Sequence, residues 1–176
     1  ISMLGNSISG FAIALLVLDN TASTFLYALF MVIYNAPKLI VPIFAGPYLD
    51  RYSRRKMIYL LDYLSAALYL MIFFLLRFWG FHFWLFLGLA FLIGSIDSVY
   101  RIAYDSLFPT LISEKNYRRA YSISSIIEPL STVMIPVAAF AYEKIGLELM
   151  FLANAATFFC AASFEIFIKA EENYTK

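Results

Sequence analysis

Long apolar segments separated by short polar connectors dominate the pattern of this chain. A helix needs about 20 residues, at a rise of 1.5 Å each, to cross the roughly 30 Å hydrocarbon core of a bilayer. Six segments approach or exceed that length, over residues 1–18, 24–49, 57–76, 83–104, 121–142 and 147–168. The pattern therefore predicts an all-α membrane protein with six transmembrane helices.

The connectors between these segments carry an uneven charge. Those after the second and fourth spans hold seven cations, Arg51, Arg54, Arg55, Lys56, Lys115, Arg118 and Arg119, whereas the opposite side holds Arg77 and Lys144. Short cytoplasmic loops collect Lys and Arg. We therefore predict a multi-pass protein of the inner (plasma) membrane with both ends of the chain in the cytoplasm. The connector 105–120 is expected to form an interfacial turn and a short amphipathic helix.

Composition excludes several classes of protein. The chain is 62% hydrophobic and 14% charged, whereas soluble domains are about one quarter charged. With one cysteine, Cys160, and one histidine, His82, neither an intrachain disulfide nor a histidine-based metal cluster or catalytic pair can be assembled. A nucleophile elbow and a phosphate-binding loop are also missing from the sequence. We predict no enzyme activity, no cofactor, no metal and no nucleic-acid partner.

The connector after the second span contains a spaced set of one glycine, one acid and four bases: Gly46, Asp50, Arg51, Arg54, Arg55 and Lys56. This set resembles the loop signature of the major facilitator superfamily, Gly-x-x-x-Asp-Arg-x-Gly-Arg-Arg, which lies between spans two and three. Ser53 stands where the family usually has glycine. The turn there must therefore be made by a residue with a side chain.

The resemblance covers almost the whole chain and narrows to the drug and macrolide efflux branch, which also contains siderophore exporters. It rests on the opening segment 1–12, on Asp62 with Leu64 and Ala66, and on Asn-Ala-Ala-Thr-Phe at 154–158. It implies a twelve-span secondary transporter that binds a hydrophobic substrate between two six-helix halves, with H⁺ as the coupling ion. Exporters often carry a glycine-rich Gly-Pro motif in span five, where this chain has Ile-Pro-Val-Ala-Ala at 135–139.

This chain matches one half of such a transporter. Residues 1–168 are expected to form the amino-terminal domain and residues 169–176 the start of a cytoplasmic linker, with the carboxy-terminal half as the missing partner. Each half is expected to contain two inverted three-helix repeats. A shift of 93 positions aligns Asp50 and Arg51 with Glu143 and Lys144, and Met57 with Met150.

Three ionisable residues lie deep within predicted spans. Lys38 is roughly 18 Å along a helix from the second connector, and Asp97 and Glu128 are roughly 12 and 13 Å from the fourth. A charge at the bilayer centre costs about 2.5 to 3.5 kcal/mol and therefore needs a partner or water. We predict that these residues, with Asn6 of the first span and Arg101 of the fourth, face a central aqueous cavity. There Lys38 pairs with Glu128 or Asp97, and Glu128, between two apolar neighbours, is the stronger proton candidate. The alternative is a purely structural salt bridge.

The fourth span carries a second charged pattern. Asp97, Arg101 and Asp105 recur every four residues, so they share one helix face and can satisfy one another. Arg54 or Arg55 of the loop can join this stripe and latch span two to span four, and the family resemblance implies a gating role for such contacts, here for Asp50 and Arg54. Alternatively, the arginines only fix topology and bind anionic lipid head groups.

These features favour the amino-terminal half of a secondary transporter that exports hydrophobic drugs such as macrolides by alternating access. Because the signature does not encode direction, an uptake transporter of the same superfamily stays open, as does a siderophore exporter. A non-transport membrane protein is the remaining class.

Overall fold

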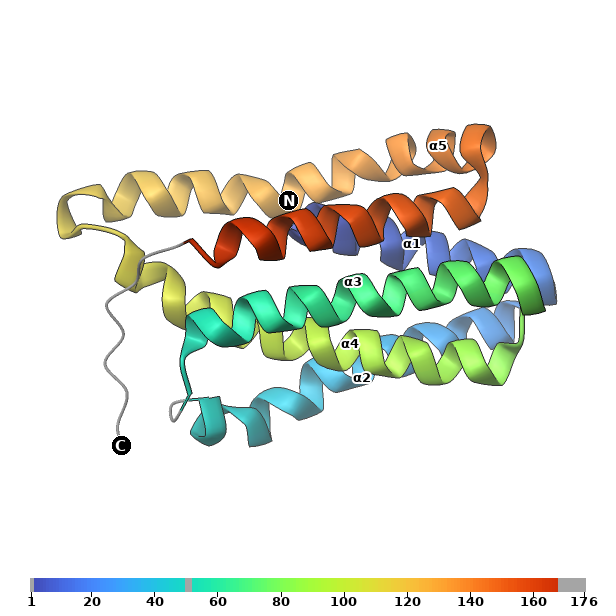
Figure 1. Ribbon diagram of the computed structural model, residues 1–176, viewed down its shortest axis with the longest axis horizontal. Coiled ribbons are helices and arrows are strands. Elements are labelled where there is room, and N and C mark those ends of the chain that lie inside the picture. Colours follow the sequence, from blue (N-terminus) through green and yellow to red (C-terminus); the bar gives the residue numbers. More distant parts are fainter. Residues whose placement is uncertain (1, 50–51, 168–176) are drawn as a thin grey trace.

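The computed structural model describes residues 2–49 and 52–167, and this part of the chain consists of helices joined by short connectors. Long helices α1 (Ser2–Thr21), α2 (Thr24–Leu49), α3 (Arg54–Trp79), α4 (Phe83–Leu107) and α5 (Tyr117–Glu165) lie along one common direction (Figure 1). Two short 3₁₀ helices, η1 (Phe108–Leu111) and η2 (Glu114–Asn116), connect α4 to α5. No strand occurs among these described residues. The predicted all-α class is confirmed at this level.

Four helical segments are long and apolar enough to cross a membrane. They are Thr24–Ala45, Arg54–Trp79, Phe83–Leu111 and Pro136–Glu165, and Ala12–Thr21 is a shorter apolar helix. Large apolar side chains are exposed on the outside of these helices, among them Phe44, Trp79 and Trp84. An apolar exterior of this kind is stable in lipid. The six-span count remains a prediction.

Helix α5 contains one break, at Gly146. This residue has φ 78° and ψ 164°, a conformation inside the helix that only glycine adopts readily. The chain turns back there, so that the part of α5 after residue 146 runs antiparallel to the part before it (Figure 1). The turn falls within the connector expected between residues 142 and 147.

Packing between the helices brings distant segments together. Helix α2 packs against α4, α1 against α5, and α3 against both α5 and α4. In the core, the ring of Tyr69 is fully buried and stacks on Phe151 and Phe158 at centroid distances of 6.2 and 5.5 Å. Stacked aromatic rings at these distances stabilise the contact beyond simple burial of apolar surface. The inverted-repeat arrangement stays a prediction.

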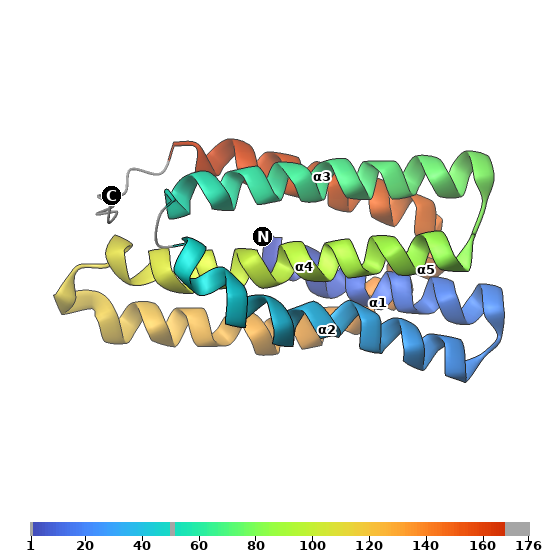
Figure 2. The same cartoon turned by 90° about the horizontal axis from the view of Figure 1, so that it is seen from below.

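One end of the bundle, which we call the basic end, contains the start of α3, the end of α4 and the start of α5 (Figures 1 and 2). Ser53 caps α3 there, because its side chain accepts a hydrogen bond from the backbone N–H of Lys56 at 3.2 Å. Its φ of −62° is open to any residue. Serine in place of the family's glycine therefore makes this turn without strain and adds a helix cap.

The connector between α4 and α5 differs from its prediction. In place of one short amphipathic helix it contains η1 and η2, and residues 117–120 already belong to α5. Pro109 lies in the first turn of η1, where its missing N–H costs nothing but prevents α4 from continuing.

Candidate functional site

Helices α2 and α4 are in close contact at Gly94. A Cβ atom at this position would lie only 2.1 Å from the backbone oxygen of Tyr34. Only glycine permits two helix backbones to approach so closely. One turn further along α4, the Tyr34 hydroxyl donates a hydrogen bond to Oδ2 of Asp97 at 3.0 Å. The close approach therefore positions a phenol from one helix against a carboxylate of another.

Lys38 lies one helical turn after Tyr34. Its Nζ is 4.3 Å from the centroid of the Tyr34 ring and donates to Oδ1 of Asn35 at 3.3 Å. An ammonium over an aromatic face is attracted by the negative charge of the ring face. Tyr34 thus uses its ring for Lys38 and its hydroxyl for Asp97. We call these residues, Tyr34, Lys38, Gly94 and Asp97, the Tyr34 cluster.

Helix α1 closes the Tyr34 cluster from a third side, because a Cβ atom at Gly10 would lie 3.4 Å from the Tyr34 hydroxyl. Tyr34 is accordingly only 7% exposed, whereas the Lys38 side chain is exposed. Asp97 lies ten residues before the end of α4, which is about 15 Å along the helix axis. The Asp97 carboxylate is therefore held near the middle of α4, beside the accessible ammonium group of Lys38.

The sequence hypothesis of a direct Lys38–Asp97 ion pair requires correction. No ion pair joins these two side chains in the described part of the chain, and Tyr34 lies between them as ring partner of one and hydrogen-bond donor to the other. The alternative pairing of Lys38 with Glu128 stays a prediction, because the Glu128 side chain lies outside the described residues. The same holds for Asn6 in α1.

The expected ion pairs within the stripe on α4 are also absent from the described side chains. Asp97 is bonded to Tyr34, while Arg101 and Asp105 are exposed. The described residues contain an ion pair at the other end of the bundle, between Arg77 and Glu148 at 3.8 Å. Asp97, Arg101 and Asp105 share one face of α4, but water competes for the charges of the exposed Arg101 and Asp105.

Arg54 and Arg55, in the first turn of α3, bind the ends of other helices. Arg54 Nη1 donates to the carbonyl oxygen of Ser106, next to Asp105, at 3.5 Å, and Arg55 donates to the carbonyl of Ile166 at the end of α5. The last carbonyls of a helix have no partner within it and carry partial negative charge. Arg54 therefore contacts α4 through a backbone oxygen, and its predicted part in a charge latch with the α4 stripe stays a prediction. Lys56 is exposed, Gly46 lies in the last turn of α2, and Asp50 and Arg51 fall outside the described residues.

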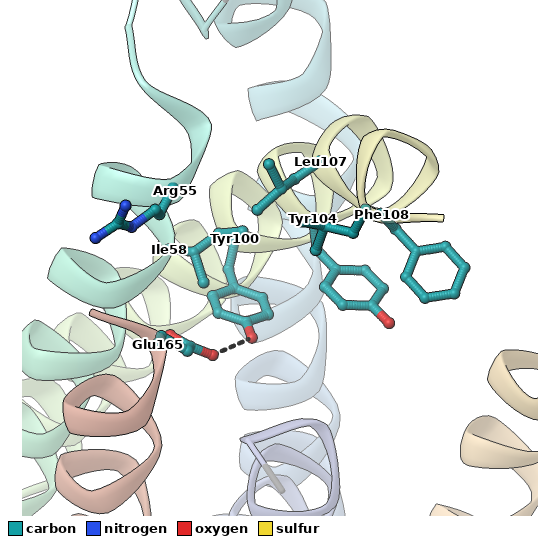
Figure 3. A pocket seen from close by; sticks show the side chains of 8 residues that line it. Arg55, Ile58, Tyr100, Tyr104, Leu107, Phe108 and Glu165 are labelled. Atoms are coloured by element: carbon teal, nitrogen blue, oxygen red, sulfur yellow. Dashed lines mark hydrogen bonds between the residues drawn. The ribbon is translucent and has the colours of Figure 1, made fainter. Parts of the chain in front are cut away.

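A small cavity of about 70 Å³ lies at the basic end. Within it the Tyr100 hydroxyl donates to Oε1 of Glu165 at 3.4 Å, with Arg55 on the neighbouring helix (Figure 3). Its remaining lining residues are mostly apolar: Ile58, Tyr104, Leu107, Phe108 and Leu111. Sequence reasoning did not identify this cavity, because its walls come from α3, from α4 with η1, and from the end of α5, which are far apart in the chain. No group of three or more metal-ligating side chains occurs among the residues described here.

The architecture defines a class before any comparison is made: a multi-pass helical membrane protein that holds charged and polar groups between its spans. The family model of the Major Facilitator Superfamily matches residues 1–175. The chain therefore belongs to the Major Facilitator Superfamily, and the resemblance stated from the sequence is confirmed at the level of the superfamily. This membership points to a transporter rather than an enzyme.

One curated relative is described as an uncharacterized MFS-type transporter, YkuC, from Bacillus subtilis (strain 168). It is 26% identical over 149 residues, which make up 84% of this chain and 34% of YkuC. The match thus spans about a third of the length of that relative. No solved structure matches the chain significantly.

Proposed function

We propose that the chain is the amino-terminal half of a secondary transporter that exports hydrophobic compounds, macrolides among them, driven by an H⁺ gradient. In this proposal six spans, arranged as two inverted repeats, work with a carboxy-terminal six-helix half, and both ends of the chain face the cytoplasm. Superfamily membership and the excess of cations at the basic end support it.

The single observation that carries the proposal is the Tyr34–Asp97 hydrogen bond. Ionisable groups inside spans are costly, and they mark substrate or proton pathways by default. Asp97 is supported by a phenol rather than neutralised by a direct ion pair, so its charge is available for a coupling ion. Lys38, exposed one turn away, then responds to that charge through the shared Tyr34 ring.

The cluster suggests how proton binding is transmitted to the helices. Protonation of Asp97 removes its negative charge, which weakens the hydrogen bond from Tyr34 and the electrostatic attraction of Lys38 to this side of the site. Because α2 and α4 touch at Gly94, a change at Tyr34 is transmitted directly to both helices. A two-state rearrangement of these helices provides the alternating access that the proposal requires.

The test uses efflux-deficient bacteria that express the full-length protein. Accumulation of a panel of hydrophobic drugs, including a macrolide, is measured with and without a protonophore. The proposal predicts lower accumulation that the protonophore restores. Unchanged accumulation across the panel contradicts drug export and favours a narrow substrate such as a siderophore, whereas increased accumulation of one compound identifies import.

A further inference from the structure

Two cationic side chains lie at the same level of neighbouring helices. Helices α2 and α4 run side by side in the same direction (Figures 1 and 2), and the hydrogen bond from the Tyr34 hydroxyl to Asp97 fixes their register. Lys38 follows Tyr34 by four residues, about one helical turn. Arg101 follows Asp97 by the same interval. Since residues four apart share a helix face, Lys38 and Arg101 are neighbours across the α2–α4 contact, one turn closer to the basic end.

The surroundings of these two cations lack a matching acid. Both lie inside segments long and apolar enough to cross a membrane, Thr24–Ala45 and Phe83–Leu111, and both side chains are exposed. Lys38 donates to the neutral amide oxygen of Asn35 at 3.3 Å. Within the described part of the chain neither cation forms an ion pair. A charge inside a span faces a partner or a water-filled cavity rather than lipid, so the two cations are suited to an anionic ligand.

The charges of the site select a monoanion. Lys38 and Arg101 contribute two positive charges and Asp97 one negative charge, which leaves a net charge of +1. Asp105, one turn beyond Arg101, is exposed to water. A carboxylate carries one negative charge, whereas a phosphate monoester carries about −1.5 to −2 at neutral pH. A guanidinium binds both oxygens of a carboxylate at once, and the ammonium of Lys38 has further donors beside the one used by Asn35.

We propose that Lys38 and Arg101 bind a carboxylate group of the transported compound. The inference rests on the proposed function for its role in transport, and it narrows the substrate class to hydrophobic compounds that carry a carboxylate. Tyr34 positions the site, because its ring holds the Lys38 ammonium at 4.3 Å while its hydroxyl is fixed on Asp97. The substrate carboxylate then lies one helical turn from Asp97, the group to which proton coupling is assigned.

Equilibrium dialysis of the purified full-length protein in neutral detergent tests the site with two probes that share a ring system, naphthoate and the uncharged naphthalenemethanol. Naphthoate should bind more tightly by about tenfold or more, as expected for hydrogen bonds between charged groups. Lys38→Met and Arg101→Gln should each remove most of this preference, whereas Lys38→Arg should retain it. Arg77→Gln, at the other end of the bundle, is the matched control and should also retain it. Equal affinities for the two probes, or an undiminished preference in Arg101→Gln, overturn the proposal.

The same measurement in bilayers separates a substrate carboxylate from a lipid phosphate. The preference for naphthoate should persist in nanodiscs of zwitterionic phosphatidylcholine and in nanodiscs that contain anionic phosphatidylglycerol. Its loss in the anionic lipid alone assigns the two cations to lipid head groups and overturns the substrate assignment. Binding is measured without a gradient, so a negative result leaves the test of proton-driven export unaffected. Conversely, failure of the export test leaves a measured carboxylate preference in place.

Discussion

The backbone oxygen of Tyr34 in α2 lies 2.1 Å from the place that a Cβ atom would take at Gly94 of α4. Any residue other than glycine at position 94 would therefore collide with the backbone of α2. This contact places the Tyr34 hydroxyl against Asp97 one turn away. The close packing of α2 against α4 therefore also sets the geometry of the candidate site.

Gly94→Ala should separate α2 from α4 and lower stability. The added methyl group meets backbone rather than a flexible side chain, and overpacking of this kind costs about 1 to 3 kcal/mol. Thermal unfolding of the purified protein measures the loss. Gly88→Ala is the matched control, because a Cβ atom there has no neighbour within 4 Å. Equal effects of the two substitutions would show that the close approach does not exist.

Tyr34→Phe should impair transport while leaving the packing of α2 intact. The change removes the donor to Asp97 but keeps the ring beneath Lys38, and loss of a bond to a charged group costs about 1.5 to 3 kcal/mol. The measurement is transport by the full-length protein at equal membrane abundance. Tyr27→Phe is the control, because the Tyr27 hydroxyl makes no hydrogen bond to the described residues. Normal transport by Tyr34→Phe excludes the hydroxyl from the mechanism.

Hydropathy predicted the helices well where their ends coincide with the change from apolar to polar residues. The second predicted span, 24–49, coincides with α2. Helix α3 begins three residues before its predicted span because Ser53 caps a first turn made of Arg54, Arg55 and Lys56. Charged residues at a helix start are invisible to a hydropathy argument, which measures the hydrocarbon-spanning part only.

The candidate site was predicted only in part, for a different physical reason. Depth along the helix identified Lys38 and Asp97, since charges within spans are rare. Tyr34 is one of 13 tyrosines, and its role depends on a contact with a residue 63 positions away in the chain. Glu165 was missed for a similar reason, because its hydrogen bond with Tyr100 of α4 joins residues 65 positions apart in the chain. Pairings between helices are not encoded in the periodicity of either helix.

Lys38→Met should reduce transport more than Lys38→Arg. Methionine keeps the length of the side chain but removes the charge over the Tyr34 ring, an interaction worth about 0.5 to 2 kcal/mol. Arginine preserves both the charge and the ring contact. Substrate efflux at matched expression compares the two variants. If both transport equally well, the positive charge at position 38 has no part in the cycle.

Arg55→Gln should loosen the end of α5 without unfolding the bundle. The carbonyl of Ile166 loses its charged donor, and removal of such a partner costs about 1 to 3 kcal/mol. Amide hydrogen exchange over residues 160–167 should increase. Lys56→Gln, at an exposed position in the same helical turn, serves as the control. Unchanged exchange in Arg55→Gln means that this arginine does not hold the helix end.

The most direct test of the central claim is gradient-dependent drug efflux by Asp97→Asn in the full-length protein, compared with wild type and with Glu148→Gln at equal membrane abundance. Asparagine keeps the size of the side chain and still accepts a bond from Tyr34, but it cannot gain or lose a proton. The account predicts that protonophore-sensitive efflux is lost in Asp97→Asn and retained in Glu148→Gln. Undiminished, protonophore-sensitive efflux by Asp97→Asn contradicts the assignment of proton coupling to the Tyr34 cluster.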